Sequence, residues 1–182
     1  MGEIDTAALK GNFAAAAANG GDDVAMYFYS YLFLKYPETR AMFPPAMTRQ
    51  RDRLVGALIR IVTDVDNVAN LVPYLEDLGR DHRKFGAVAA HYPAVGEALL
   101  TTLRHFSGDS WTQKLHDDWA AAYGIVAGAM VDAGYAKRNG DRLVCKILFS
   151  RGQLTVNGKP QAIPGLGGPP AESTGEAIRP AE

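Results

Sequence analysis

Apolar positions recur every three or four residues along most of the first 134 residues, which is the spacing of one face of a helix. The pattern predicts helices at about residues 5–18, 23–36, 49–65, 68–82, 93–106 and 111–134. A single short turn is expected at 37–43, because two consecutive prolines follow it. No stretch of this region alternates with a period of two, so we predict an all-α domain of six or seven helices.

The chain changes character after residue 136. Residues 142–149 and 153–156 have the pattern of two strands, and a segment rich in proline and glycine follows residue 160. A two-stranded hairpin is marginally stable alone, and the last segment has too few apolar residues to form a core. We therefore predict a helical domain at 1–136 and a C-terminal extension at 137–182 that is hairpin-like or disordered.

His82 is the histidine whose position suggests that it binds a ligand. The pattern places its imidazole on an apolar helix face together with Val72, Leu75, Leu78, Phe85 and Val88. A metal could bind one ring nitrogen while a backbone carbonyl accepts a hydrogen bond from the other. The alternative, a core histidine satisfied by ordinary hydrogen bonds, fits this stretch alone at least as well.

Composition and charge narrow the classes of function. The chain has 182 residues, 47% of them hydrophobic, with 19 basic and 20 acidic residues and a formal net charge of -1. This suits one domain and gives no strong field for nucleic acid or an anionic membrane surface. The single cysteine, Cys145, excludes an internal disulfide, and a signal-peptide pattern is missing, which predicts a cytoplasmic protein. No apolar run approaches the roughly 20 residues needed to span a bilayer.

A series of aromatic, polar and small residues runs in a defined order and spacing through the predicted helices. Its members are Phe28-Tyr29, Leu32-Phe33, Pro37-Glu38, Met42-Phe43, Gln50-Arg51, His82, Phe85, Tyr92, Val95-Gly96-Glu97, Trp119 and Ala122-Tyr123-Gly124. In this order the series resembles the globin family, and most closely the haem domain of bacterial flavohaemoglobins and their single-domain relatives. The similarity covers about residues 5–134. It implies a globin fold around a haem pocket, with haem b as the cofactor.

The resemblance also implies roles for individual residues. His82 corresponds to the proximal ligand of the haem iron, and Tyr29 and Gln50 correspond to the distal hydrogen-bond donors. A tyrosine hydroxyl and a glutamine amide can both donate to bound O₂, which carries partial negative charge. The residues implied to contact the haem are Phe43, Leu54, Leu58, Lys84, Val95 and Leu99.

The proximal side departs from the family's pattern. In flavohaemoglobins a tyrosine and a glutamate lie behind the proximal histidine and make it a stronger donor to iron. Tyr92 matches the tyrosine, which gives it an implied catalytic role. The position of the glutamate is Gly134, and Asp132 is the nearest acid. Nothing after residue 134 resembles the flavin and nicotinamide domains of a flavohaemoglobin.

Three functions remain open. The first is reversible binding of the diatomic gases O₂, NO and CO for storage, delivery or scavenging. The second is a nitric oxide dioxygenase that works with a separate reductase. The third is a haem-free helical module that contacts another protein. The polar pair Tyr29 and Gln50 favours the second, whereas the missing reductase domains and proximal glutamate favour the first.

Other polar residues are weaker candidates. His91 lies in a loop without a second donor at metal-ligand spacing, so we expect it at the surface. His105, His116 and Cys145 are assigned no role. Three basic residues flank His82 and form either a solvated helix end favoured by the helix dipole or contacts to haem propionates: Arg80, Arg83 and Lys84.

Overall fold

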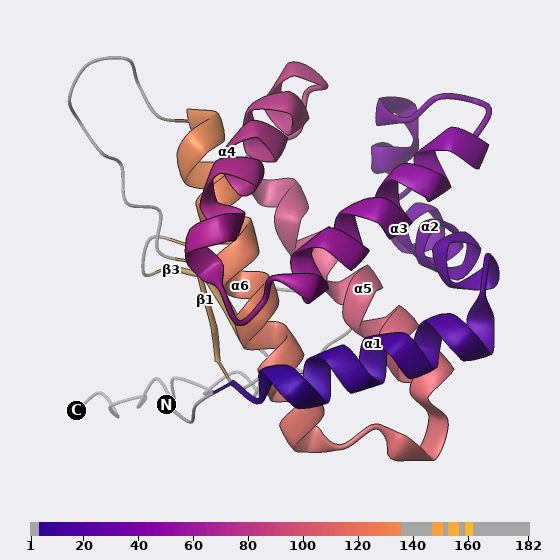
Figure 1. Cartoon of the computed structure of the whole chain (residues 1–182). Helices are drawn as coiled ribbons and strands as arrows, with labels where there is room; N and C mark the ends of the chain where they lie inside the picture. The colour runs from indigo at the N-terminus through magenta and orange to yellow at the C-terminus, as the bar shows by residue number, and fades with distance from the viewer. Residues whose placement is uncertain (1–3, 136–146, 151–152, 157–158, 162–182) are drawn as a thin grey trace, which may run out of the picture.

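The computed structural model describes residues 4–135 and the strand segments 147–150, 153–156 and 159–161 (Figure 1). Its helical elements are α1 (Thr6–Gly20), α2 (Asp23–Lys35), η1 (Pro37–Met42), α3 (Thr48–Thr63), α4 (Val68–Lys84), η2 (Ala89–His91), α5 (Tyr92–Ser107), η3 (Gly108–Ser110) and α6 (Gln113–Tyr135). The predicted all-α domain is confirmed. The short turn expected at 37–43 is the 3₁₀ helix η1, and Pro44 and Pro45 prevent it from continuing as a longer helix.

The ends of α1, α2 and α3 differ in how they are capped. The side chain of Asp5 accepts a hydrogen bond from the Ala8 amide at 2.9 Å, as expected of a cap. Gly21 ends α1 with a positive φ of 49°. Asp22 precedes α2, but its side chain makes no capping bond, because its backbone is already helical. Helix α3 begins at Thr48, and its N-cap residue Met47 makes no side-chain capping bond.

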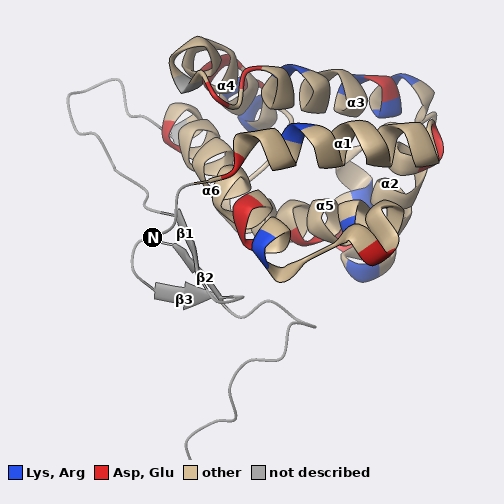
Figure 2. Ribbon diagram, turned by 60° about the horizontal axis from the view of Figure 1, so that its bottom comes forward, with Lys and Arg blue, Asp and Glu red and all other residues tan. Residues whose placement is uncertain are grey.

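The helices form two packed pairs with α1 laid across them. Helix α4 packs along α6, and α2 packs on α5, while α1 contacts both α5 and α6 (Figures 1 and 2). The crossing of α4 over α6 is tight, since a Cβ on Gly79 would lie 2.1 Å from the carbonyl oxygen of Met130. In Figure 2 basic and acidic residues are interspersed over the helices, consistent with the small net charge.

The apolar side chains form two clusters of buried residues. The larger one contains Phe28, Tyr29, Leu32, Leu99, Leu103 and Trp119, among others. The second lies where α4, α6 and the first residue of α5 meet, and it contains Leu71, Leu75, Tyr92, Ala127, Met130 and Val131. Tyr123 packs against both clusters, so its ring connects them.

A buried polar network joins α1, α5 and α6. The indole nitrogen of Trp119 donates to the Asn12 side-chain oxygen at 3.0 Å. The Asn12 amide in turn donates to the Ser107 hydroxyl at 2.7 Å. Within the described residues, no buried side-chain nitrogen or oxygen lacks a hydrogen-bond partner. Burial of these polar groups is therefore compensated, as a stable core requires.

Three strands follow the helices. β1 (Ile147–Ser150), β2 (Gln153–Val156) and β3 (Lys159–Gln161) form an antiparallel sheet in that order, and β1 lies beside α6. β1 and β2 form a hairpin where strands were predicted at 142–149 and 153–156, although β1 ends one residue later and residues 142–146 lie outside the described residues, and β3 is a strand that the sequence pattern did not predict. Cys145 and the predicted disordered segment after residue 161 lie outside the described residues. No helix in the described part of the chain has the length and apolar character to cross a membrane.

Candidate functional site

Tyr29 on α2 and Gln50 on α3 are in contact. Tyr29 is 6% exposed. The Gln50 amide nitrogen donates to the Tyr29 hydroxyl oxygen at 3.1 Å, and that hydroxyl lies 3.4 Å from the Gln50 backbone carbonyl. The second distance is long for an O–H donor, so the phenolic proton is weakly engaged. Burial raises the pKa of Tyr29 and the Gln50 hydrogen bond opposes that effect, which leaves a neutral hydroxyl donor.

An aromatic group holds the Tyr29 ring. Its ring centroid lies 5.4 Å from that of Phe43 and 5.7 Å from that of Phe33. The Arg40 guanidinium lies 5.1 Å from the Phe33 ring centroid and donates to the Phe43 carbonyl at 3.0 Å. The turn η1 therefore brings Phe43 beside Tyr29, and Arg40 fixes the end of that turn.

The other residues implied to line the haem pocket gather near Tyr29. Leu99 is 8% exposed and belongs to the same cluster of buried residues as Tyr29. Leu54, Leu58 and Val95 are partly buried and pack against that cluster. Residues from α2, α3 and α5, and Phe43 after η1, thus belong to or pack against one cluster of buried residues.

His82 lies in the last turn of α4, on the side of the second cluster. Its Nδ1 is 2.8 Å from the carbonyl oxygen of Leu78. In the tautomer that donates this bond, Nε2 keeps its lone pair. The ring centroid of His82 lies 6.3 Å from that of Tyr92, whose backbone carbonyl accepts a 2.6 Å hydrogen bond from the hydroxyl of the partly buried Tyr123.

The predicted apolar face around His82 is wrong in one respect. His82 is exposed, and so are Val72, Phe85 and Val88, at 39%, 74% and 44%. The face of α4 that packs on α6 runs instead through Leu71, Leu75 and Gly79. The close approach at Gly79 fixes the rotation of α4, and His82, three residues later, points off that line towards Tyr92.

The basic residues beside His82 have different partners. Arg80 pairs with Asp77 at 2.6 Å, and Lys84 pairs with Asp81 at 2.8 Å, which lowers the pKa of Asp81. Arg83 instead reaches another helix, where its Nη1 donates to the Gly134 carbonyl at 2.7 Å. The sequence pattern gave no sign of that contact, because it joins residues 51 positions apart.

The remaining histidines have local partners. Nδ1 of His91 accepts a hydrogen bond from the Val88 amide at 3.3 Å. The ring of His105 stacks on Tyr27 with centroids 4.3 Å apart. His116 lies 3.1 Å from the Asp117 carboxylate. Within the ranges that the structure describes, no three His, Cys, Asp or Glu side chains gather into a metal-binding group.

Sequence reasoning missed a buried carboxylate. Glu97 on α5 is 6% exposed and accepts hydrogen bonds from the hydroxyls of Tyr31, at 2.7 Å, and Tyr36. The ammonium of Lys35 lies 3.9 Å away. An acidic residue in the apolar part of a helix needs buried donors, so its position among Val95 and Leu99 was the available signal. This cluster joins the end of α2 to α5.

A surface hollow lies elsewhere. It has a volume of about 320 Å³ and is lined by Lys10, Phe13, Ile59, Val62 and Thr63, from α1 and α3. None of the predicted site residues lines it. Its position therefore does not change the assignment of the candidate site.

Comparisons with known proteins agree with this fold. The sequence profile of the globin family matches residues 27–130. The flavohemoprotein of Bacillus subtilis is 31% identical over 114 residues, which are 61% of this chain and 29% of the relative. The flavohemoprotein of Vibrio cholerae is 31% identical over 119 residues, which are 63% of this chain and 30% of the relative. The chain thus spans less than a third of the length of these relatives.

Solved structures give the same result. A bacterial globin from Campylobacter jejuni superposes with a TM-score of 0.62 at 24% identity, covering 71% of this chain and 93% of that one. A candidate nitric oxide dioxygenase from Rhodothermus marinus, engineered as a carbene transferase, superposes with a TM-score of 0.65 at 25% identity, covering 74% and 93%. The globin profile covers more than half of the residues of this chain. The chain therefore belongs to the globin family of haem proteins.

Proposed function

We propose that this globin binds haem b with His82 as the axial ligand of the iron, and reversibly binds O₂ and NO beside Tyr29 and Gln50. The observation that carries the proposal is the 2.8 Å contact between Nδ1 of His82 and the Leu78 carbonyl. Such a contact is the usual second partner of a histidine that ligates a metal, because it fixes the tautomer and the ring orientation. It leaves Nε2 as the ligating atom.

The donor set of the described residues fits a haem better than a free metal ion. A metal ion alone needs three or four protein ligands, and no such group occurs in the described part of the chain. A porphyrin supplies the other ligands itself, so one histidine suffices. The apolar side chains of Phe43, Leu54 and Leu99 provide surface suited to its ring.

Tyr29 and Gln50 would select among gaseous ligands. Haem, when bound, supplies an iron with a position for a diatomic gas. The Tyr29 hydroxyl is buried and neutral, so it can donate its proton to a ligand that carries partial negative charge. O₂ carries more of that charge than CO. Tyr29 should therefore hold O₂ more strongly than an apolar residue would and leave CO nearly unaffected.

Nitric oxide dioxygenation is the second candidate function. Its support is the buried Tyr29–Gln50 pair and the structural likeness to the Rhodothermus marinus protein. Conversion of NO and O₂ to nitrate consumes one electron, so a separate reductase is a further part of this proposal. Tyr92, whose ring lies 6.3 Å from that of His82, is the tyrosine implied to support the proximal histidine.

A spectroscopic titration tests the proposal. The purified full-length chain is mixed with haem, reduced and exposed to CO. We expect a Soret band that saturates at one haem per chain and shifts on CO binding. NO consumption is then followed with O₂ and a chemical reductant, and turnover favours the dioxygenase over simple gas binding. A chain that produces no Soret band would instead be a haem-free helical module.

A further inference from the structure

Helix α4 meets α6 along a line of residues one helical turn apart. Leu71 and Leu75 are buried against α6, and Gly79 comes so close that a Cβ there would lie 2.1 Å from the Met130 carbonyl oxygen. Arg83 is the next residue on that line. Glycine at 134 serves the same approach, because a Cβ there would lie 3.0 Å from the Gly79 carbonyl oxygen.

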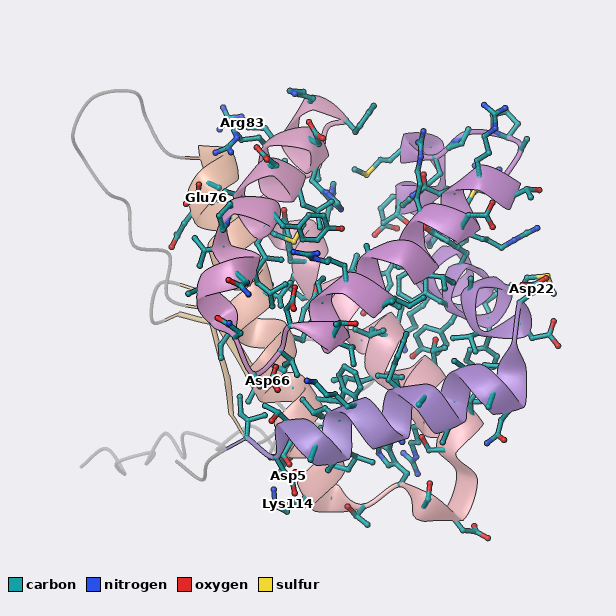
Figure 3. The ribbon with its side chains drawn as sticks, in the orientation of Figure 1. Asp5, Asp22, Asp66, Glu76, Arg83 and Lys114 are labelled. Carbon is teal, nitrogen blue, oxygen red and sulfur yellow. The ribbon has the colours of Figure 1, made fainter. Side chains whose placement is uncertain are left out.

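Arg83 ends this line with a hydrogen bond to α6. Its Nη1 donates to the carbonyl oxygen of Gly134 at 2.7 Å, and Figure 3 shows Arg83 beside the C-terminal end of α6. Helix α6 ends at Tyr135, so the Gly134 carbonyl is among the last four, which lack a partner within the helix. The guanidinium both satisfies this carbonyl and places a cation at the negative end of the helix dipole.

His82 lies in the same turn as Arg83. Their side chains leave the helix about 100° apart, so Arg83 faces α6 while His82 faces Tyr92. The last turn of a helix frays readily, and here it contains the Leu78 carbonyl contact that orients the imidazole. Whatever holds this turn in place also holds the His82 ring.

We propose that Arg83 is a positioning residue, which clamps the last turn of α4 onto the end of α6 and so fixes the orientation of His82. The inference rests on the proposed role of His82 as iron ligand. It gives the exposed Arg83 a contact between two helices, which is not part of either role expected from the sequence, a solvated helix end or a haem propionate contact.

The test compares Arg83→Met, which keeps the length of the side chain but removes its donors, with Arg83→Lys, which keeps one charged donor. Arg80→Met is the matched control, since Arg80 pairs with Glu76 and Asp77 of its own helix. Amide hydrogen exchange is measured in the full-length protein at residues 79–85. The iron–histidine stretching band is measured by resonance Raman spectroscopy on the ferrous haem-loaded protein without a gas.

Loss of one hydrogen bond should accelerate exchange in this turn by about 2- to 12-fold in Arg83→Met. The iron–histidine band should shift or broaden in the same variant, Arg83→Lys should lie between it and the wild type, and Arg80→Met should change neither readout. Unchanged exchange, or faster exchange with an unmoved band, would overturn the proposal. If His82→Ala keeps the iron–histidine band, the ligand assignment has failed instead, which is a separate result.

Discussion

The side-chain amide of Gln50 donates to the hydroxyl oxygen of Tyr29 at 3.1 Å. This bond occupies a lone pair of the hydroxyl and leaves its proton available, since the contact to the Gln50 carbonyl is 3.4 Å long. The Tyr29 hydroxyl therefore accepts from Gln50 while its own proton is only weakly engaged. We propose that Gln50 orients the hydroxyl and that Tyr29 is the group that donates to a ligand.

Replacing Tyr29 by phenylalanine should speed O₂ dissociation. A hydrogen bond to a charged acceptor contributes about 1.5–3 kcal/mol, which corresponds to a roughly 10- to 150-fold faster rate. Gln50→Leu should have a smaller effect, and the double variant should match Tyr29→Phe within about twofold if the two act in series. Stopped-flow replacement of O₂ by CO measures the rates, with CO dissociation as the control. Equal O₂ rates in wild type and Tyr29→Phe would show that the hydroxyl does not reach the ligand.

Alanine at position 79 should destabilise the crossing of α4 and α6. Its Cβ would lie 2.1 Å from the Met130 carbonyl oxygen, so the helices must separate, at a cost of about 1–3 kcal/mol. Gly128→Ala in α6 is the control, because nothing lies within 4 Å of its Cβ position. That substitution should be neutral or stabilise the helix by about 0.5–1 kcal/mol. Urea unfolding compares the two variants, and equal free energies of unfolding would rule out the close crossing.

The free energy of unfolding should fall at alkaline pH because of Tyr36, whose hydroxyl donates to Glu97. Burial raises the pKa of Tyr36, and its hydrogen bond to Glu97 and the charge of that carboxylate raise it further. The unfolded chain loses the phenolic proton near pH 10, whereas the folded protein keeps it. Folding is thus favoured by this group below pH 10, and the contribution is lost as the pH rises beyond that value.

The measurement is the free energy of unfolding between about pH 8 and 11. Tyr36→Phe should flatten the fall above pH 10, and Glu97→Gln should flatten it partly, because burial still raises the pKa when the charge has gone. Identical pH profiles for wild type and Tyr36→Phe would contradict this assignment.

The boundary between a domain at 1–136 and an extension at 137–182 stays a prediction. A chain that ends at residue 136 should fold, because both clusters of buried residues lie within the helices. Some loss of thermal stability is expected, since β1 lies beside α6. Thermal unfolding measures it. Insolubility, or a fall in Tm of more than about 10 °C, which is a few kcal/mol for a domain of this size, would place the extension within the folded unit.

The sequence predicted the helices because local signals define them. Asp5 marks a helix start through its side chain, and Gly21 and Pro37 mark helix ends through their backbone preferences; the structure places the ends within a few residues of the expected positions. The order and spacing of a longer series of residues, which includes Tyr29, Gln50 and His82, indicated the family.

Long-range contacts could not be predicted in the same way. A stripe of apolar residues shows that a helix has a buried face, but the rotation of that face depends on the neighbouring helix. In α4 the close approach of Gly79 to Met130 sets the rotation of the helix. Leu71 is therefore buried, while Val72 and His82 are exposed. The bond between Arg83 and Gly134 depends on the same crossing, and no local pattern encodes it.

The axial ligand can be tested most directly with His82→Ala. The variant and the wild type are mixed with haem, reduced, and compared by absorption spectroscopy with and without added imidazole, with His91→Ala as the control. We predict that His82→Ala loses the Soret band or binds haem loosely, that imidazole restores a five-coordinate spectrum, and that His91→Ala matches the wild type. Full haem occupancy with an unchanged five-coordinate spectrum in His82→Ala would contradict the assignment of His82 and make His91 the next candidate.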